Sequence, residues 1–319
     1  SFSVQAFIWP TTPKKGKQTV IGNWSENDKK GFSLGLSEKN KGICLTIGLG
    51  QKGTFIFETG KPVLANEWYF IAATYNSTTG IVKLKQEPLH NHAETTDSFE
   101  GTRRLGPKKP QLDVKDIPLT IGALYQTIDA RRLVCSEHFN GKIDSPSLCN
   151  TPLTNIEIEK LKRSGQELGK IGGLLAKWDF SADIMGRTVK DQSANRADGI
   201  VINMPTRAMT GWNWTGDELC WKNAPEEYGA IHFHDDDVHD AGWEVDFSLR
   251  IPRSFRSGLY AARLRCGKSL EEEDYVPFAV LPPRGKATAK ICFLLPTASY
   301  MAYANEHMGT DAPIAQLLG

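Results

Sequence analysis

Histidines and aspartates crowd one short stretch of the chain, AIHFHDDDVHDAGW, at residues 230–243. Imidazole and carboxylate groups are common metal ligands, and a period of two would place His232 and His234 on one face of a strand. In the competing interpretation both histidines lie on an exposed edge strand, and the aspartates at 235–237 form a turn by bonding backbone N–H groups. We favour the turn, because a His-x-His pair without a third ligand at fixed spacing is a weak motif.

Two tyrosines form a second candidate site. Tyr300 and Tyr303 follow the apolar run ICFLL at 291–295, which is typical of a strand buried on both faces in a parallel sheet. Folds of the α/β class place their chemistry at the carboxyl ends of parallel strands, so both phenol groups would lie near a ligand. The alternative is that they are packing aromatics whose hydroxyl groups are satisfied locally. The residues alone leave these two interpretations open.

Composition excludes several classes of function. The 319 residues include 38 basic and 37 acidic side chains, and a net charge of +1 provides no field for nucleic acid or an anionic membrane. No run approaches the ~20 apolar residues of a membrane helix, and the first residues lack the layout of a signal peptide. The six cysteines are scattered without a CxxC pair, which predicts reduced thiols in a cytoplasmic protein.

The elements that would position these residues begin with a β-rich region. Short apolar stretches separated by Gly, Asn, Ser and Pro turns predict that residues 1–204 form an all-β sandwich. Within WYFIAATY, Tyr69 and Ile71 fall on one face and Phe70 and Ala72 on the other. Both faces are apolar, so this strand is predicted to be packed on both sides.

A loop and a helix interrupt the predicted strands. The polar segment between residues 86 and 118 predicts a long surface loop in which His90 and His92 are solvated. Later, TPLTNIEIEKLKRSG offers Thr154 as the N-cap and Glu157 three residues on, which is the pattern of a capping box. We expect a short amphipathic helix that lies on the sandwich.

Two further domains are predicted after the sandwich. Residues 205–283 would form a small immunoglobulin-like β domain, in which WEVDFSLRI (243–251) alternates as a half-exposed strand and 259–266 and 275–283 pair antiparallel. Residues 284–319 would begin an α/β domain that is too short to close a core. The chain is therefore expected to be the N-terminal part of a longer protein.

Specific motifs carry a family resemblance. The segments NEWYFIAATYNSTTGIVKL, PLTIGA, FNGKIDSPSLCNTPLTNIEIEKL and LLAKWDFS resemble, in order and spacing, a laminin-G-like, concanavalin-type sandwich domain. Behind them, GWNWTGDELCWKNAPEEYGAIHFHDDDVHDAGWEVDFSLRIPRSFRSGLYAARLRCG and then FLLPTASYMAYANEH are similar to the large (beta) subunits of the N,N-dimethylformamidase family. The resemblance extends over essentially the whole chain.

The resemblance implies a function and a cofactor. The family hydrolyses N,N-dimethylformamide to formate and dimethylamine with a mononuclear non-haem ferric iron, held by two tyrosines and a glutamate. Its large subunit assembles with a small subunit and with further copies of itself. We carry one ligand over to Tyr303, with Tyr300 as the fallback, and expect the other ligands beyond Gly319. This chain alone is then incomplete and inactive, and we assign it no catalytic residue.

Two other functions fit the same residues. A laminin-G-like module could bind a carbohydrate or another ligand, with Trp9, Trp24 and Trp68 as stacking platforms, although tryptophans in such domains are more often core. Alternatively, the β domains serve as scaffold and assembly elements of the enzyme. In that case the histidines and aspartates at 230–243 fix a turn and contact another domain or the small subunit.

Overall fold

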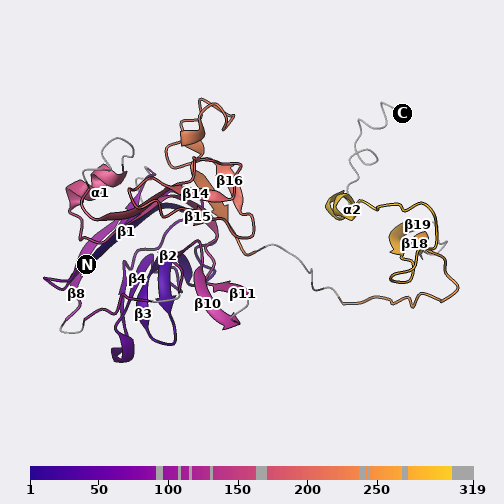
Figure 1. Ribbon diagram of the computed structural model, residues 1–319, viewed down its shortest axis with the longest axis horizontal. Coiled ribbons are helices and arrows are strands. Elements are labelled where there is room, and N and C mark those ends of the chain that lie inside the picture. Colours follow the sequence, from indigo (N-terminus) through magenta and orange to yellow (C-terminus); the bar gives the residue numbers. More distant parts are fainter. Residues whose placement is uncertain are drawn as a thin grey trace. The chain divides into compact units, whose positions relative to one another are not determined.

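A computed structural model describes residues 1–90, 96–106, 109–114, 117–129, 132–162, 171–236, 242, 244–267 and 272–303. The chain divides into two compact units, Ser1–His239 and Asp240–Gly319, and each is described by itself (Figure 1). Within the described ranges, no helix has the length and apolar character needed to cross a membrane.

Two antiparallel sheets make up the first unit. The larger has ten strands in the order β15-β14-β13-β12-β1-β6-β7-β8, with β17 on the edge of β12 and β16 beside β17. Its strands are β1 (Phe2–Pro10), β6 (Tyr69–Asn76), β7 (Ile81–Pro88), β8 (Phe99–Arg104), β12 (Gly141–Cys149), β13 (Leu174–Asp179), β14 (Thr188–Asp191), β15 (Gly199–Ile200), β16 (Thr206–Met209) and β17 (Ala230–Phe233).

The smaller sheet has five strands in the order β5-β4-β3-β2-β9. A separate hairpin of two strands, β10 and β11, belongs to the same unit. The bounds of these elements are β2 (Gln18–Ser25), β3 (Lys30–Leu36), β4 (Ile43–Gly48), β5 (Thr54–Glu58), β9 (Thr120–Ile121), β10 (Leu124–Asp129) and β11 (Arg132–Ser136). The described part of the unit also contains the 3-10 turns η1 (Gly50–Lys52) and η3 (Pro225–Tyr228).

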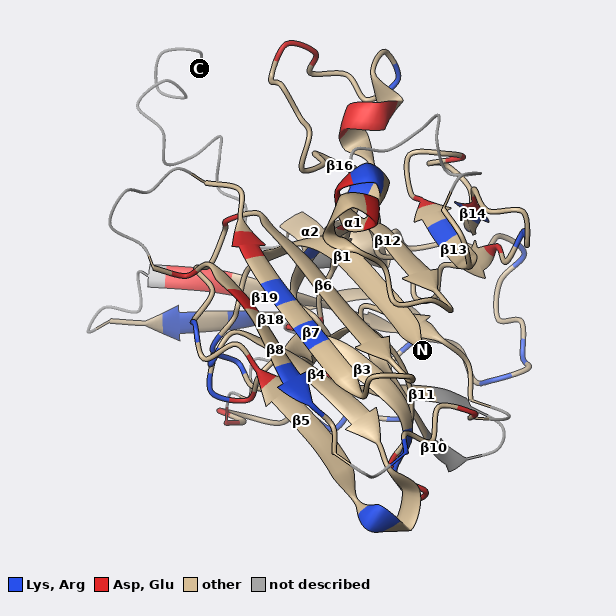
Figure 2. Cartoon of the chain, turned by 90° about the vertical axis from the view of Figure 1, so that its left-hand side faces the viewer, with Lys and Arg blue, Asp and Glu red and all other residues tan. Residues whose placement is uncertain are grey.

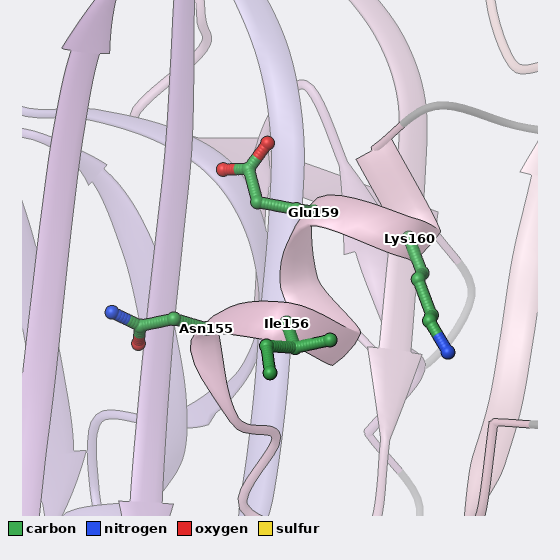
Figure 3. Close-up of a pocket in the computed structure, with 4 residues that line it drawn as sticks. All are labelled: Asn155, Ile156, Glu159 and Lys160. Atoms are coloured by element: carbon green, nitrogen blue, oxygen red, sulfur yellow. The ribbon is translucent and has the colours of Figure 1, made fainter.

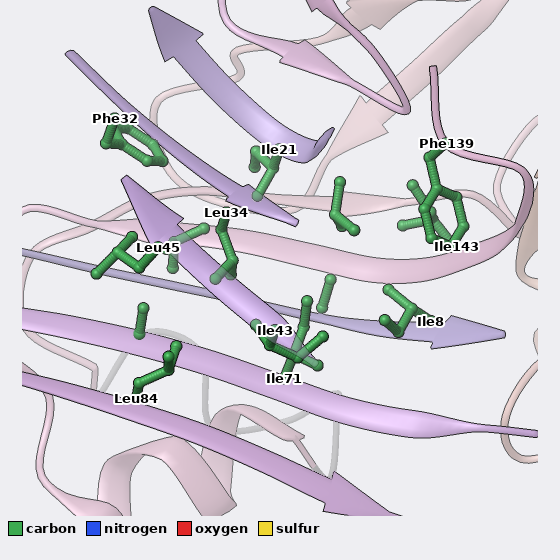
Figure 4. Close-up of a cluster of buried hydrophobic side chains, with 14 of the residues drawn as sticks. Ile8, Ile21, Phe32, Leu34, Ile43, Leu45, Ile71, Leu84, Phe139 and Ile143 are labelled. Carbon is green, nitrogen blue, oxygen red and sulfur yellow. The ribbon is translucent and has the colours of Figure 1, made fainter. Parts of the chain in front are cut away.

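The main core lies between the two sheets. Isoleucine, leucine and phenylalanine side chains from both sheets fill it, among them Ile8, Leu34, Ile43 and Phe139, which are fully buried (Figure 4). Removing such apolar surface from water is the dominant favourable term in folding. The predicted β-sandwich over the first part of the chain is confirmed.

Strand β6 is buried on both faces, as its sequence predicts. Tyr69 and Ile71 enter the core between the sheets, whereas Phe70 and Ala72 enter a second cluster on the outer face of the larger sheet. The helix α1 (Asn155–Lys162) covers that second cluster.

The predicted capping box begins α1. The backbone N–H of Glu157 donates to Thr154 Oγ1 over 3.3 Å, and the backbone N–H of Thr154 donates to Glu157 Oε2 over 2.8 Å. Ile158 and Leu161 then face the sheet and are buried. The short amphipathic helix on the sandwich is confirmed.

The predicted surface loop at 86–118 contains a strand, and this part of the prediction is wrong. Six residues of β8 pair with β7, and Phe99 at the start of β8 contacts Phe57 edge to face, with 6.0 Å between the ring centroids. His90 is also buried rather than solvated, with Nε2 3.0 Å from Asp97 Oδ2. His92 lies outside the described residues.

The edge of β12 is shared by two strands. Residues 147–149 of β12 pair with β13, and residues 141–144 pair with β17. Residues 206–233, predicted to open the second domain, therefore add two strands to the first sheet. The division into domains at 1–204, 205–283 and 284–319 stays a prediction.

The second unit has one hairpin and one helix among its described residues. Strands β18 (Gly258–Cys266) and β19 (Glu272–Val280) pair antiparallel, which confirms the predicted pairing of this region. The helix α2 (Thr297–Tyr303) follows.

Two strands predicted for the second unit are not formed. Residues 244–251 and 291–295 have no strand structure, and their apolar side chains are exposed, with Val245 at 81% and Leu294 at 89%. A strand needs a neighbour to pair with its backbone groups, and within the described residues of this unit only β18 and β19 pair. Trp243 lies outside the described residues. The immunoglobulin-like and α/β forms of these regions stay predictions.

Candidate functional site

Tyr300 and Tyr303 lie one turn apart on α2, so their side chains share a face of the helix. Both are exposed, at 48% and 69%. No parallel strand precedes them among the described residues, so the argument that placed them at a strand end has no support there. Phenol oxygens are hard donors suited to a ferric ion, and their exposure leaves them open to one. The described residues contain no group of three His, Cys, Asp or Glu side chains that could hold a metal ion.

The two histidines of the opening run share a face, as predicted. The ring centroids of His232 and His234 are 5.6 Å apart, while Ile231 and Phe233 on the other face pack into the main core. Burial is the largest cause that lowers the pKa of His232, followed by the nearby His234 and Lys142.

Asp235 fixes the chain just after β17. Its carboxylate forms an ion pair with Lys15 and lies 3.6 Å from His138 Nδ1, and its backbone N–H donates to Asn140 Oδ1 over 3.0 Å. Among the described residues the carboxylate of Asp235 therefore contacts side chains, and the predicted turn at 235–237 stays a prediction because Asp237 lies outside them. With no three-residue metal group in the described residues, the structure offers no support for a metal site here. Asp237, His239 and Asp240 lie outside the described residues.

A buried lysine lies beside these histidines on the outer face of the larger sheet. Lys142 on β12 is directly opposite Trp9 on β1 and His232 on β17, and opposed residues share a face. Its Nζ lies 4.6 Å from the ring centroid of Trp9 and 5.8 Å from that of Trp68, and donates to Thr210 Oγ1 over 2.7 Å. Burial lowers the pKa of Lys142, and the two indole rings offset part of the lost hydration.

The three tryptophans considered as stacking platforms differ in their surroundings. Trp24 is only 4% exposed, and its Nε1 donates to Glu26 Oε2 over 2.7 Å, so it is not a platform. Trp9 and Trp68 are half-buried, and Lys142 of the same chain already lies against both rings.

The buried carboxylate of Asp144 lies at the end of the part of β12 that pairs with β17, before the part that pairs with β13. Asp144 accepts hydrogen bonds from Ser145 Oγ over 2.8 Å and from the backbone N–H of Trp212 over 3.4 Å, and burial raises its pKa to about 7. A Cβ at Gly211 would lie 2.6 Å from Asp144 Oδ2, so a side chain there would displace the Asp144 carboxylate. Sequence analysis missed this group. The signal was the aspartate next to Ile143, a core residue, in the motif FNGKID.

Trp212 attaches the segment after β16 to the same face. Its ring stacks flat on Phe7, with centroids 4.2 Å apart and an angle of 5° between the planes. Asp144 and Lys142 therefore hold the base of this segment, because they bond Trp212 and Thr210. The outer face of the larger sheet thus carries two buried charged side chains, Lys142 and Asp144, that bond the segment after β16.

Comparison with known proteins identifies relatives of both parts of the chain. Residues 206–312 match the family described as N,N-dimethylformamidase beta subunit-like, C-terminal, and residues 1–86 match the concanavalin A-like lectin/glucanases superfamily. The chain is 35% identical over 328 residues to the N,N-dimethylformamidase beta subunit of Paracoccus aminophilus, and 34% identical over 333 residues to that of Alcaligenes sp. The chain is a relative of the N,N-dimethylformamidase beta subunits.

These alignments cover a much larger share of this chain than of its relatives. Each covers 99% of this chain and 42% of the relative, so the chain spans less than half the length of the curated relatives it matches. The matched superfamily at residues 1–86 and the two facing sheets agree with the predicted mainly β, concanavalin-like fold.

Solved structures resemble the sandwich at low sequence identity. A putative carbohydrate binding protein from Bacteroides ovatus is 18% identical, with a TM-score of 0.43 and coverage of 62% of this chain and 51% of that one. The sialidase module CBM40 from Ruminococcus gnavus is 13% identical, with a TM-score of 0.37 and coverage of 52% and 83%.

Proposed function

We propose that this chain is part of the large subunit of an iron-dependent amidohydrolase that cleaves N,N-dimethylformamide, or a similar small amide, to formate and dimethylamine. The observation that supports the proposal is the 35% identity, over 99% of the chain, to a protein named N,N-dimethylformamidase beta subunit. The proposed location is the cytoplasm, and the six free cysteines fit a reducing compartment.

In this proposal the first unit is mainly scaffold. Its sheets bury a continuous apolar core, and its buried polar groups are engaged with one another on the outer face of the larger sheet. Such a unit holds and shields a neighbouring catalytic domain, and contacts the small subunit and further copies of the large subunit. The chain alone would then bind no stoichiometric iron and hydrolyse no formamide.

Tyr303, with Tyr300 as the fallback, is the proposed iron ligand within this chain. A phenolate donates a hard, anionic oxygen, and the exposed position on α2 leaves that oxygen accessible to an ion completed by other residues. When bound, the metal would supply Lewis acidity toward the formyl oxygen and acidify a water molecule. The further ligands would come from outside the described residues.

The Tyr303→Phe change tests the proposal in the full-length subunit assembled with its small subunit. The expected result is loss of most bound iron and at least a hundredfold fall in turnover of N,N-dimethylformamide, because phenylalanine has no oxygen donor. The measurements are iron per protein by mass spectrometry and dimethylamine release. Tyr275→Phe is the matched control, since Tyr275 is also an exposed tyrosine of the second unit, at 51%.

The outcomes separate the ligand from the function. Full iron and full turnover in the Tyr303→Phe variant would remove Tyr303 from the site, and the same assay then applies to Tyr300→Phe. Absence of hydrolysis by the unmodified assembly, across a series of small amides, would contradict the proposed reaction itself.

A further inference from the structure

The segment between β16 and β17, residues 211–228, forms a loop that projects beyond the larger sheet (Figure 1). Its base is fixed: Trp212 stacks on Phe7, and the backbone N–H of Gly211 donates to the carbonyl oxygen of Glu227 over 2.7 Å. We call residues 211–228 the projecting loop.

Hydrogen bonds inside the projecting loop hold its outer part in one shape. Tyr228 is buried, and its hydroxyl donates to the carbonyl oxygen of Glu218 over 2.7 Å and accepts from Trp214 Nε1 over 3.3 Å. The Glu227 carboxylate accepts from the backbone N–H of Thr215 over 2.9 Å. Glu218 in turn accepts from the backbone N–H of Cys220 over 2.8 Å and from Asn223 Nδ2 over 2.9 Å.

The middle of the projecting loop carries apolar side chains that belong to neither core cluster. Leu219 is 80% exposed and Trp214 is 41% exposed, and Trp221 lies beside them in sequence and is half-buried. A surface loop loses conformational entropy when it is held rigid, so a rigid loop with an exposed apolar tip is suited to binding. Tryptophan is also among the residues that contribute most to protein interfaces.

The charge of the loop limits the kind of partner. It carries four acidic residues, Asp217, Glu218, Glu226 and Glu227, against the single base Lys222, a net charge of −3 on a chain whose total is +1. Asp217 and Glu226 are exposed at its surface, and Figure 2 shows acidic residues along the loop above β16. A complementary partner therefore has an apolar pocket with a rim of lysine or arginine.

A second copy of this chain is a poor match for that description. The hollow on α1 is lined by Asn155, Ile156, Glu159 and Lys160, whose side chains point in different directions (Figure 3). Its charged residues are one acid, Glu159, and one base, Lys160. A second hollow nearby has Lys83 as its single charged residue. Neither of these two hollows among the described residues combines an apolar pocket with a basic rim, which favours a partner other than a second copy of this chain.

We infer that the projecting loop docks the small subunit of the enzyme, with Leu219, Trp214 and Trp221 entering an apolar pocket that has a basic rim. The inference rests on one part of the proposed function, which is that the large subunit assembles with a small subunit. It assigns to this loop the contact that holds the two kinds of subunit together.

The test uses the full-length large subunit co-expressed with its small subunit. Leu219→Asp places a charge at the apolar tip, and the paired change Asp217→Lys with Glu226→Lys reverses the exposed charge. Ile200→Ala is the control, because Ile200 is 72% exposed on the edge strand β15. Sedimentation velocity over a dilution series gives the dissociation constant between the two subunits.

Leu219→Asp and the charge reversal are each expected to weaken small-subunit binding at least tenfold, and Ile200→Ala less than twofold. In the charge-reversal variant the remaining binding should increase with added salt, whereas binding of the unmodified protein should decrease. Circular dichroism and the melting temperature check that the variants are folded.

Three results would overturn the inference: unchanged small-subunit binding in folded variants, loss of contacts between large subunits alone, or a lower melting temperature of the large subunit without weaker binding. Amide hydrolysis is measured in parallel. If the unmodified assembly hydrolyses no amide but the loop variants still dissociate, the proposed function fails and the docking role stands.

Discussion

At the scale of single residues, the unusual groups are two charges buried on one strand. Lys142 and Asp144 lie two positions apart on β12, so both point to the outer face of the larger sheet. Each bonds the segment that follows β16, Lys142 through Thr210 and Asp144 through the backbone of Trp212. A buried charge is costly unless it is compensated, which makes this segment dependent on both groups.

Asp144 should make the stability of the first unit depend on pH. Its pKa is about 7 in the folded chain against 3.8 for a free side chain, so between these values the folded state holds a proton that the unfolded state releases. The free energy of unfolding should then fall as pH rises from 4 to 7, by up to about 1.4 kcal/mol per pH unit, and level off above pH 7. Asp144→Asn should remove that slope.

Urea unfolding at several pH values, followed by tryptophan fluorescence, measures the effect. The difference between the unmodified chain and Asp144→Asn isolates this one carboxyl group, because the other titrating groups are common to both. Asp113→Asn, at an exposed position, is the control. A pH-independent difference between the unmodified chain and Asp144→Asn would mean that Asp144 is ionised throughout.

At the scale of elements, α1 is attached to the sheet by local and long-range contacts together. Lys162 Nζ lies 2.6 Å from Glu87 Oε1 on β7, and 5.0 Å from the ring centroid of Phe70 on β6. Lys85 on β7 reaches Glu159 on the helix, with 3.1 Å between Nζ and Oε1. These contacts surround the apolar cluster beneath the helix, so α1 should be lost only when the larger sheet unfolds.

The capping box should contribute measurably to this attachment. Thr154→Ala removes the side-chain oxygen that accepts from the backbone N–H of Glu157, and such losses cost about 1 kcal/mol of stability. The free energy of unfolding of the 319-residue chain in urea should fall by that amount. Thr78→Ala, an exposed threonine in the turn after β6, should change it by less than half as much. Equal effects of the two changes would contradict a capping role.

At the scale of the whole molecule, the two units differ in how well each buries its apolar surface. The first unit closes a core between two sheets and a second cluster under α1. In the second unit, by contrast, Val245, Phe247, Ile291 and Leu294 are all more than half exposed. An apolar surface of this extent favours association with further protein.

This difference predicts separate behaviour of fragments cut between the units. Residues 1–239 should fold alone and unfold cooperatively, because their sheets need nothing beyond this range. Residues 240–319 alone should lack a cooperative transition and should bind an apolar dye such as ANS, because a two-stranded hairpin is marginal in water. Calorimetry and dye fluorescence measure both. A sharp calorimetric transition of the second fragment would contradict the prediction.

Much of the first unit could be predicted from sequence because its signals are local. Alternation along β6 determines which residues face each side, and the spacing from Thr154 to Glu157 specifies the start of α1 whatever surrounds it. The strands that were predicted wrongly depend instead on pairing with distant segments. β8 is an edge strand with one apolar anchor, Phe99. Residues 244–251 alternate as a strand does but pair with no neighbour among the described residues.

The sequence by itself therefore determined the β-sandwich, the hairpin of β18 and β19, the capped helix and the similarity to N,N-dimethylformamidase beta subunits. Only the tertiary structure brought Asp144 to the backbone of Trp212, 68 residues away, and placed Lys142 against two indole rings. It also placed residues 230–233 as a strand on the edge of β12, followed by an ion pair between Asp235 and Lys15. The physical reason is that residue type and spacing specify local geometry, whereas burial and partners depend on which distant segments meet when the chain closes.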